Sequence, residues 1–284
     1  MTRTLKAWEK LILLFIYFLF VFGANYIIKY VFNLTPNLTF LGKAPFIIMM
    51  VFIIIFLAIK FAERKPFSHY GLKRFSGKDF RLMIIFILLL MPLAFLGRMI
   101  DPGYDLWYAK GTGLMTLYGV FIFAATMPLY VIKEEIIVRA FMQNRLRTYG
   151  FLWMAIALSI NFAFAHFFLP EKGLIHVIVW ALSVLVGSFA LIVFFELTRN
   201  LWLSALLHLL FNVIIGLQIY LHVVRQTIEW VFWAVMMLLA IYAWKSTGKQ
   251  FIQPFKEKIQ MIPAIEIIFL IIFAILFPLA LLLL

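Results

Sequence analysis

The chain has 284 residues, of which 66% are hydrophobic and 13% charged, and its mean hydropathy is +1.07. A soluble domain is nearer half apolar and a quarter charged, so these values exclude that class and predict an all-α, polytopic membrane protein. The net charge of +13 is expected to anchor cytoplasmic loops to anionic lipid headgroups rather than to bind nucleic acid. The absence of cysteine excludes disulfides, thiolate nucleophiles and cysteine-ligated metals.

Apolar stretches of about 20 residues, the length that crosses a bilayer, predict nine spans, or eight if one stretch is re-entrant or peripheral. In chain order the expected spans are 11–32, 45–61, 82–96, 112–147, 151–169, 174–195, 201–221, 227–244 and 262–284. The fourth would be about 54 Å long at about 1.5 Å per residue, so it is expected to tilt, break or project into the cytoplasm. No repeat or compositional boundary divides the chain, which predicts a single integral membrane domain over 1–284.

Most lysines and arginines fall on one side of these expected spans. They lie in the first ten residues, in 60–81, at 145–147 and in 245–258. The positive-inside rule therefore predicts that the N-terminus and these loops face the cytoplasm. We expect an integral protein of the cell (plasma) membrane, with its polar site reached from the cytosolic side.

Three charged residues interrupt the fourth span, and each needs a physical reason. A charge at the centre of a membrane helix costs roughly 2.5–3.5 kcal/mol on insertion scales. Glu135 precedes Arg139 by four residues, which is the favourable order for an ion pair on one helix face. Glu134 is rotated by about 100° from Glu135 and is left out of that pair. The alternative is a charge cluster at a helix end, at the cytoplasmic interface.

Further polar residues interrupt the spans that follow. The fifth span contains Asn161 and His166, and the seventh contains Ser204, His208 and Asn212, each four residues after the last and therefore on one face. Polar groups in membrane helices usually face the bundle interior or a cavity. Depths estimated along the helices allow Glu134 and both histidines to meet at one level, in a wet site open to the cytosol.

Such a set of side chains is suited to hydrolysis. A glutamate beside a histidine can polarise a water for attack on a carbonyl, and a histidine and an asparagine four residues apart can stabilise an oxyanion. Ser204 as a nucleophile, with His208 as its base, lacks a clear third partner. Glutamate and two histidines are also an acceptable zinc set. The residues leave water activation with or without a divalent metal open, and no other cofactor is expected.

Three motifs resemble the CPBP family of CAAX proteases and bacteriocin-processing or immunity proteins, also called the Abi family. They are E-E-x-x-x-R at Glu134, Glu135 and Arg139, F-x-x-x-H at Phe162 and His166, and H-x-x-x-N at His208 and Asn212. They occur in this order on successive apolar stretches. The resemblance covers about 113–216 and predicts a catalytic core built from the fourth to seventh helices.

The resemblance implies an intramembrane, glutamate-type endopeptidase without a metal. Glu134 and His166 would activate the water, His208 and Asn212 would form the oxyanion hole, and Glu135 and Arg139 would support the site. Eukaryotic members of the family cleave prenylated CAAX proteins. The implied partners here are a peptide or protein substrate, lipidated or not, and membrane lipid. The alternatives are a non-proteolytic immunity or partner-binding protein that keeps the motifs, and a proton-coupled transporter.

Overall fold

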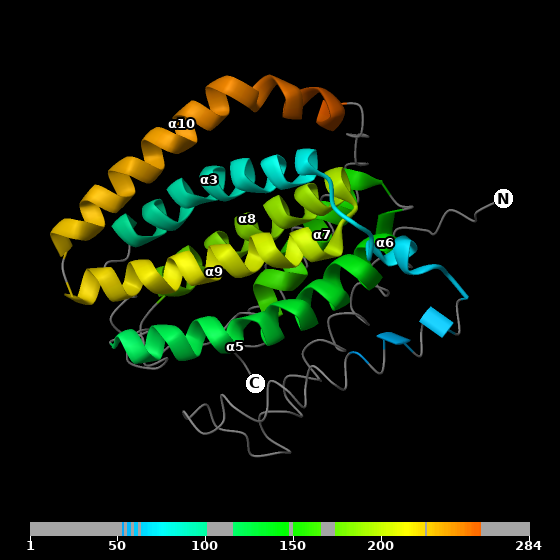
Figure 1. Cartoon of the computed structure of the whole chain (residues 1–284), viewed down its shortest axis with the longest axis horizontal. Coiled ribbons are helices and arrows are strands. Elements are labelled where there is room, and N and C mark those ends of the chain that lie inside the picture. Colours follow the sequence, from blue (N-terminus) through cyan, green and yellow to red (C-terminus); the bar gives the residue numbers. More distant parts are fainter. Residues whose placement is uncertain are drawn as a thin grey trace, which may run out of the picture. The chain divides into compact units, whose positions relative to one another are not determined.

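The structure is a computed structural model, and it describes residues 53, 56–57, 60–61, 64–100, 116–147, 150–165, 174–224 and 226–256 (Figure 1). All regular secondary structure in these residues is helical, which confirms the all-α class. The expected spans 11–32 and 262–284, and most of 45–61, lie outside the described residues. The number of spans therefore stays a prediction.

The described helices agree in order with the expected spans. They are η2 Phe67–Tyr70, α3 Gly77–Ile100, α5 Leu117–Glu135, η3 Ile136–Gln143, α6 Asn144–Leu146, α7 Phe151–Ala165, α8 Leu174–Thr198, α9 Leu201–Val224 and α10 Gln226–Lys256. Among the described residues, the stretch Ala181–Thr198 of α8 is long and apolar enough by itself to cross a membrane. Shorter apolar stretches occur in α7, α9 and α10.

The fourth expected span is one helical run that changes its winding. It begins at Leu117, where the Thr116 side chain caps the helix by accepting a hydrogen bond from the Gly119 amide at 3.0 Å. At Ile136 the α-helix α5 passes into the π-helix η3, and the run ends in the short α6. Hydropathy does not reveal this local change in hydrogen bonding, and the expected tilt, break or projection into the cytoplasm stays a prediction.

Two helices, α3 and α10, are longer than hydropathy predicts by more than one helical turn. The α3 helix begins at Gly77 rather than near 82, because Ser76 and Asp79 cap it reciprocally through side chain-to-amide bonds of 3.1 and 3.2 Å. The α10 helix continues to Lys256 rather than ending at Trp244. Hydropathy locates only the end of the apolar stretch, and helix propensity does not explain the continuation, since the segment contains Gly248 and Pro254.

The chain packs into two compact units, each described here by itself. Of the described residues, one unit holds those in 142–192 and 249–256, and the other holds those up to 141 and those in 193–248. In the first unit, α7 contributes a series of fully or nearly fully buried side chains: Trp153, Met154, Ala155, Ala157, Leu158 and Ser159. Gln143, also in this unit, donates its side-chain amide to the Ile192 carbonyl at 3.1 Å.

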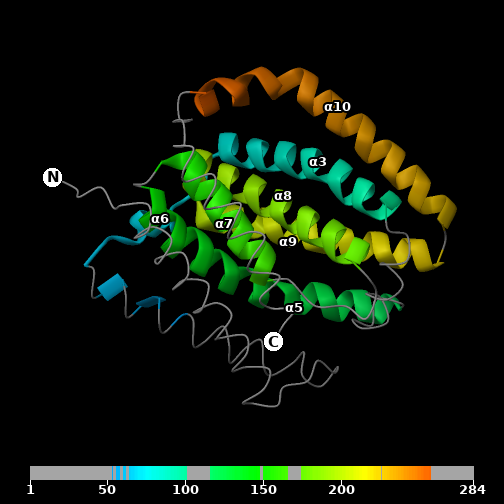
Figure 2. The ribbon, with the colours of Figure 1, turned by 180° about the vertical axis from the view of Figure 1, so that it is seen from behind.

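In the second unit, α9 packs against both α3 and α5, and both views draw it between them (Figures 1 and 2). Its apolar cluster joins residues from distant parts of the chain: Phe56, Tyr70, Ile136, Ala140, Phe141, Phe195 and Leu201. This cluster packs the first turns of η3 against the start of α9. The polar residues of α5 and α9 are thereby held on neighbouring helices.

The turn that leads into α9 is held by hydrogen bonds to residues 71–73, which lie far earlier in the chain. The Gly71 carbonyl accepts a hydrogen bond from the Leu201 amide at 2.8 Å, and the Asn200 side chain donates to the Lys73 carbonyl at 3.2 Å. Gly71 has a φ of 83°, and a Cβ there would lie 2.7 Å from the Phe195 ring. Only glycine fits this contact without strain. The segment 71–73 therefore fixes the start of α9.

Candidate active site

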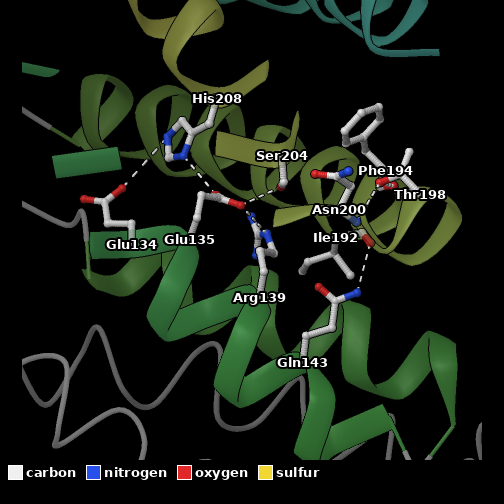
Figure 3. A network of polar contacts seen from close by, with 10 residues as sticks. All are labelled: Glu134, Glu135, Arg139, Gln143, Ile192, Phe194, Thr198, Asn200, Ser204 and His208. Carbon is white, nitrogen blue, oxygen red and sulfur yellow. Dashed lines mark hydrogen bonds and ion pairs between the residues drawn. The ribbon is translucent and has the colours of Figure 1, made fainter. Parts of the chain in front are cut away.

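The charged residues at the end of α5 face the polar residues of α9 (Figure 3). Glu134 and Glu135 are the last two residues of α5, and Arg139 lies in η3. Ser204 and His208 project from one face of α9 toward the glutamates. Both helices belong to the same unit, so the contacts are internal to it.

Glu135 is the anchored carboxylate of the pair. Its Oε2 accepts a hydrogen bond from the Ser204 hydroxyl at 2.6 Å and lies 3.3 Å from Arg139 Nε, while Oε1 lies 3.0 Å from His208 Nδ1. The Glu135–Arg139 ion pair predicted from the sequence is confirmed. A cluster at a wet helix end would expose its charges, but the side chains of Glu135 and Arg139 are 1% and 0% exposed. The interfacial interpretation is therefore disfavoured.

The change to π-helix coincides with this ion pair. Glu135 ends the α-helical winding, and η3 begins at the next residue. Hydrogen bonds in a π-helix span five residues instead of four, so the segment changes the direction of the side chains that follow, and such segments are frequent at functional sites. Arg139 lies inside this segment and reaches back to Glu135.

His208 lies between the two glutamates. An ionised carboxylate can only accept hydrogen bonds, so we assign the hydrogen to Nδ1, which donates to Glu135 at 3.0 Å. The other ring nitrogen, Nε2, lies 3.9 Å from Glu134 Oε2. That distance is too long for a direct hydrogen bond and is compatible with one water that contacts both groups at about 2.8 Å.

Glu134 differs from Glu135 in its surroundings. Its side chain is 20% exposed, whereas that of Glu135 is 1% exposed. Its described ionic contacts are long: His208 Nε2 lies 3.9 Å from one carboxylate oxygen, and Lys133 Nζ lies 4.0 Å from the other. Glu134 is thus the carboxylate that can hold a reactive water.

Asn212 lies one turn beyond His208 on α9 and packs toward α5. Its side-chain amide donates to the Met127 sulfur at 3.8 Å. A thioether is a weak acceptor, so the amide can exchange this contact for a stronger oxygen acceptor at little cost.

Some of the predicted site lies beyond these contacts. His166 falls outside the described residues, and Asn161 is buried in α7, in the other unit. The structure therefore brings together Glu134, Glu135, Arg139 and His208, and places Asn212 on the next turn. In the described part of the chain, no group of three histidine, aspartate or glutamate side chains is arranged to hold a metal ion.

Two residues beside these carboxylates have roles that the sequence did not assign. Ser204 donates to Glu135 and so acts as an anchor for it rather than as a nucleophile. Its four-residue spacing from His208 was the available signal. Lys133 lies beside Glu134. The sequence feature that could have identified it is a lysine directly before two glutamates in an apolar helix.

Comparison with known proteins identifies this region. A family model described as type II CAAX prenyl endopeptidase Rce1-like matches residues 113–214, a stretch that includes all the candidate residues named from the sequence. No curated protein and no solved structure matches the chain. The matching family is membrane-embedded, and its description names a peptidase activity. The match over residues 113–214 supports a resemblance of this part of the chain to the CAAX protease, or CPBP, family of membrane-embedded peptidases.

Proposed function

We propose that this protein is a membrane-embedded endopeptidase in which Glu134, together with His166, activates a water for attack on a peptide carbonyl. The observation that carries the proposal is the position of the His208 ring, 3.0 Å from the anchored Glu135 and 3.9 Å from the accessible Glu134. An anchored carboxylate that orients an imidazole, next to a second, partly exposed carboxylate, supports general-base hydrolysis with Glu134 as the base and the oriented His208 ring as an oxyanion donor.

The reaction begins with the loss of a proton from the bound water. The water oxygen attacks the carbonyl carbon, and its proton passes to Glu134. The carbonyl becomes a tetrahedral oxyanion. When the carbon–nitrogen bond breaks, the proton moves from Glu134 to the leaving amine. The products are a new carboxyl end and a released peptide with a free amine.

His208 and Asn212 stabilise the oxyanion in this proposal. Because Nδ1 donates to Glu135, His208 offers a second donor at Nε2 only when the ring carries both protons. Asn212 contributes its amide after releasing the weak contact with Met127. A buried donor at such a position typically contributes about 2.7–4 kcal/mol to transition-state stabilisation.

The substrate is a peptide or protein whose C-terminal or membrane-proximal segment enters the site in an extended form. The matching family is described by prenyl endopeptidase activity, and a lipidated substrate is therefore the first to test. The accessible Glu134 faces the cytosolic side in this proposal, with the N-terminus in the cytoplasm and the protein in the plasma membrane.

The test is cleavage by purified protein of a panel of lipidated and unlipidated peptides. Glu134→Gln removes the base and keeps the size of the side chain, so kcat should fall by about 10²–10⁴-fold with little change in KM. His166→Ala should have a similar effect. The control is Asp79→Asn, which removes a carboxylate at the start of α3, away from the site.

Two outcomes contradict the proposal. If Glu134→Gln cleaves as fast as the wild type, the assignment of the base is wrong. If the wild type cleaves no peptide, and Glu134→Gln complements cells that lack the protein as well as the wild type does, the chain acts as a non-proteolytic partner-binding protein.

A further inference from the structure

Lys133, the residue before the two glutamates, is a buried cation that the mechanism above does not use. It lies in α5 and is 8% exposed. Its Nζ is 4.0 Å from Glu134 Oε1 and 5.6 Å from the centre of the Tyr130 ring. A buried charge is costly unless it is paired and hydrogen-bonded. Its presence at this place therefore requires an explanation.

The two cations of the cluster have different partners. Arg139 is completely buried and lies 3.3 Å from Glu135, where it balances the anchored carboxylate. Lys133 has a partner at 4.0 Å, which is beyond hydrogen-bonding distance. An ammonium group has three donors, and within the described residues no acceptor lies within hydrogen-bonding distance of Nζ. Its donors are therefore available to water or to an incoming group.

The two carboxylate oxygens of Glu134 face different residues. Oε2 faces His208, on the side where the reactive water is placed, and Oε1 faces Lys133. A group bound at Lys133 would thus lie beside the scissile bond without displacing that water. The group that complements a lysine in a mostly apolar site is an anion of about the size of a carboxylate.

We infer that Lys133 binds the C-terminal carboxylate of the peptide substrate and so places the cleavage position a few residues from the chain end. The inference rests on the proposed function. The terminal carboxylate would contact Nζ, Nζ lies near Glu134, and Glu134 holds the water that attacks the scissile carbonyl. Summed along these contacts, the distance from the terminal carboxylate to the scissile carbonyl is at most about 15 Å. An extended chain advances about 3.3–3.6 Å per residue, so the released fragment has at most about four residues.

A different role for Lys133 makes a different prediction. If the lysine acts only on the charge of Glu134, its removal affects every substrate by the same factor. If it binds the terminal carboxylate, its removal slows cleavage of a peptide with a free C-terminus and spares the C-terminal amide of the same peptide. The ratio of the two kcat/KM values therefore separates the roles.

The experiment uses the full chain in lipid nanodiscs and one peptide in two forms. The probe is a fluorogenic peptide with a farnesylated cysteine followed by three residues, made as the free acid and as the C-terminal amide. The wild type should prefer the acid by at least about tenfold, equal to about 1.4 kcal/mol. Lys133→Met should bring the ratio close to one, and Lys133→Arg should retain most of the preference. Lys78→Met, an exposed lysine of α3, is the matched control and should keep the wild-type ratio.

Binding provides a readout that does not need cleavage. The Glu134→Gln protein should bind the acid more tightly than the amide. The double variant Glu134→Gln, Lys133→Met should bind both forms with the same affinity. An unchanged acid-to-amide ratio in Lys133→Met, in cleavage or in binding, overturns the inference. Equal loss for both peptides also overturns it, since the lysine then acts on Glu134 alone. If the wild type cleaves neither form but its Glu134→Gln variant binds them with a Lys133-dependent preference, the proposed hydrolysis fails and the carboxylate site stands.

Discussion

Removal of one partner from the Glu135–Arg139 pair should strongly destabilise the protein. The two side chains are 1% and 0% exposed, so water cannot replace the lost partner. Arg139→Met keeps most of the side-chain volume and leaves Glu135 with the Ser204 and His208 contacts alone. Loss of one member of a buried ion pair typically costs about 3–5 kcal/mol, because the other charge stays buried without compensation.

A double variant, Glu135→Gln with Arg139→Met, tests whether the two side chains act as a pair. Glu135→Gln should also cost about 3–5 kcal/mol, because it leaves the Arg139 charge buried without its carboxylate. In the combined Glu135→Gln, Arg139→Met protein neither charge remains, and the introduced side-chain amide can still accept a hydrogen bond from Ser204. We therefore expect the double variant to be destabilised by much less than the sum, with a coupling energy of at least about 2 kcal/mol.

The free energy of unfolding can be followed by tryptophan fluorescence during SDS titration of protein in mixed micelles. The matched control is Arg81→Met at an exposed position of α3, which should stay within about 0.5 kcal/mol of the wild type. Additive effects of the two single substitutions, or an Arg139→Met cost below about 1 kcal/mol, would show that the pair does not hold α5 and η3 as described.

Two other predictions concern the start of α9 and the anchor of Glu135. Gly71→Ala should lower the free energy of unfolding by at least about 1–2 kcal/mol, because its φ is 83° and the new Cβ would meet a ring. Gly77→Ala, where a Cβ meets open space, is the control in the same unfolding assay. Ser204→Ala removes a 2.6 Å bond to Glu135 and should lower kcat by about tenfold with little change in KM, since the His208 ring is less firmly oriented. Peptide cleavage kinetics test it, and an unchanged kcat would contradict the role of Ser204.

Local spacing predicted those parts of the site that lie on one helix. A separation of four residues places Glu135 beside Arg139, and the structure confirms the pair. The same spacing places Ser204 and His208 on one face of α9, and both contact Glu135. These relations depend only on helix geometry, which the sequence carries directly.

Relations between distant segments could not be obtained in this way. The contact of Gly71 with the start of α9 joins positions far apart in the chain, and a single sequence has no periodic signal for it. Hydropathy located the helices but not their ends, as α3 and α10 show, and the start of α3 depends on capping outside the apolar stretch. The π-helical winding of η3 also lacked a signal, since its composition is that of an ordinary apolar helix.

The adjacent glutamates illustrate how contacts assign roles that spacing leaves open. From sequence, Glu134 was distinguished only by its absence from the Arg139 pair. The structure adds that Glu135 is held by three side chains and is inaccessible to solvent, which makes it a poor place for a reactive water. Glu134 is partly exposed, faces His208 with one oxygen and faces Lys133 with the other. In the proposed mechanism the same carboxylate serves as the base on one side, and the proposed role of the lysine on its other side is to set where the substrate ends.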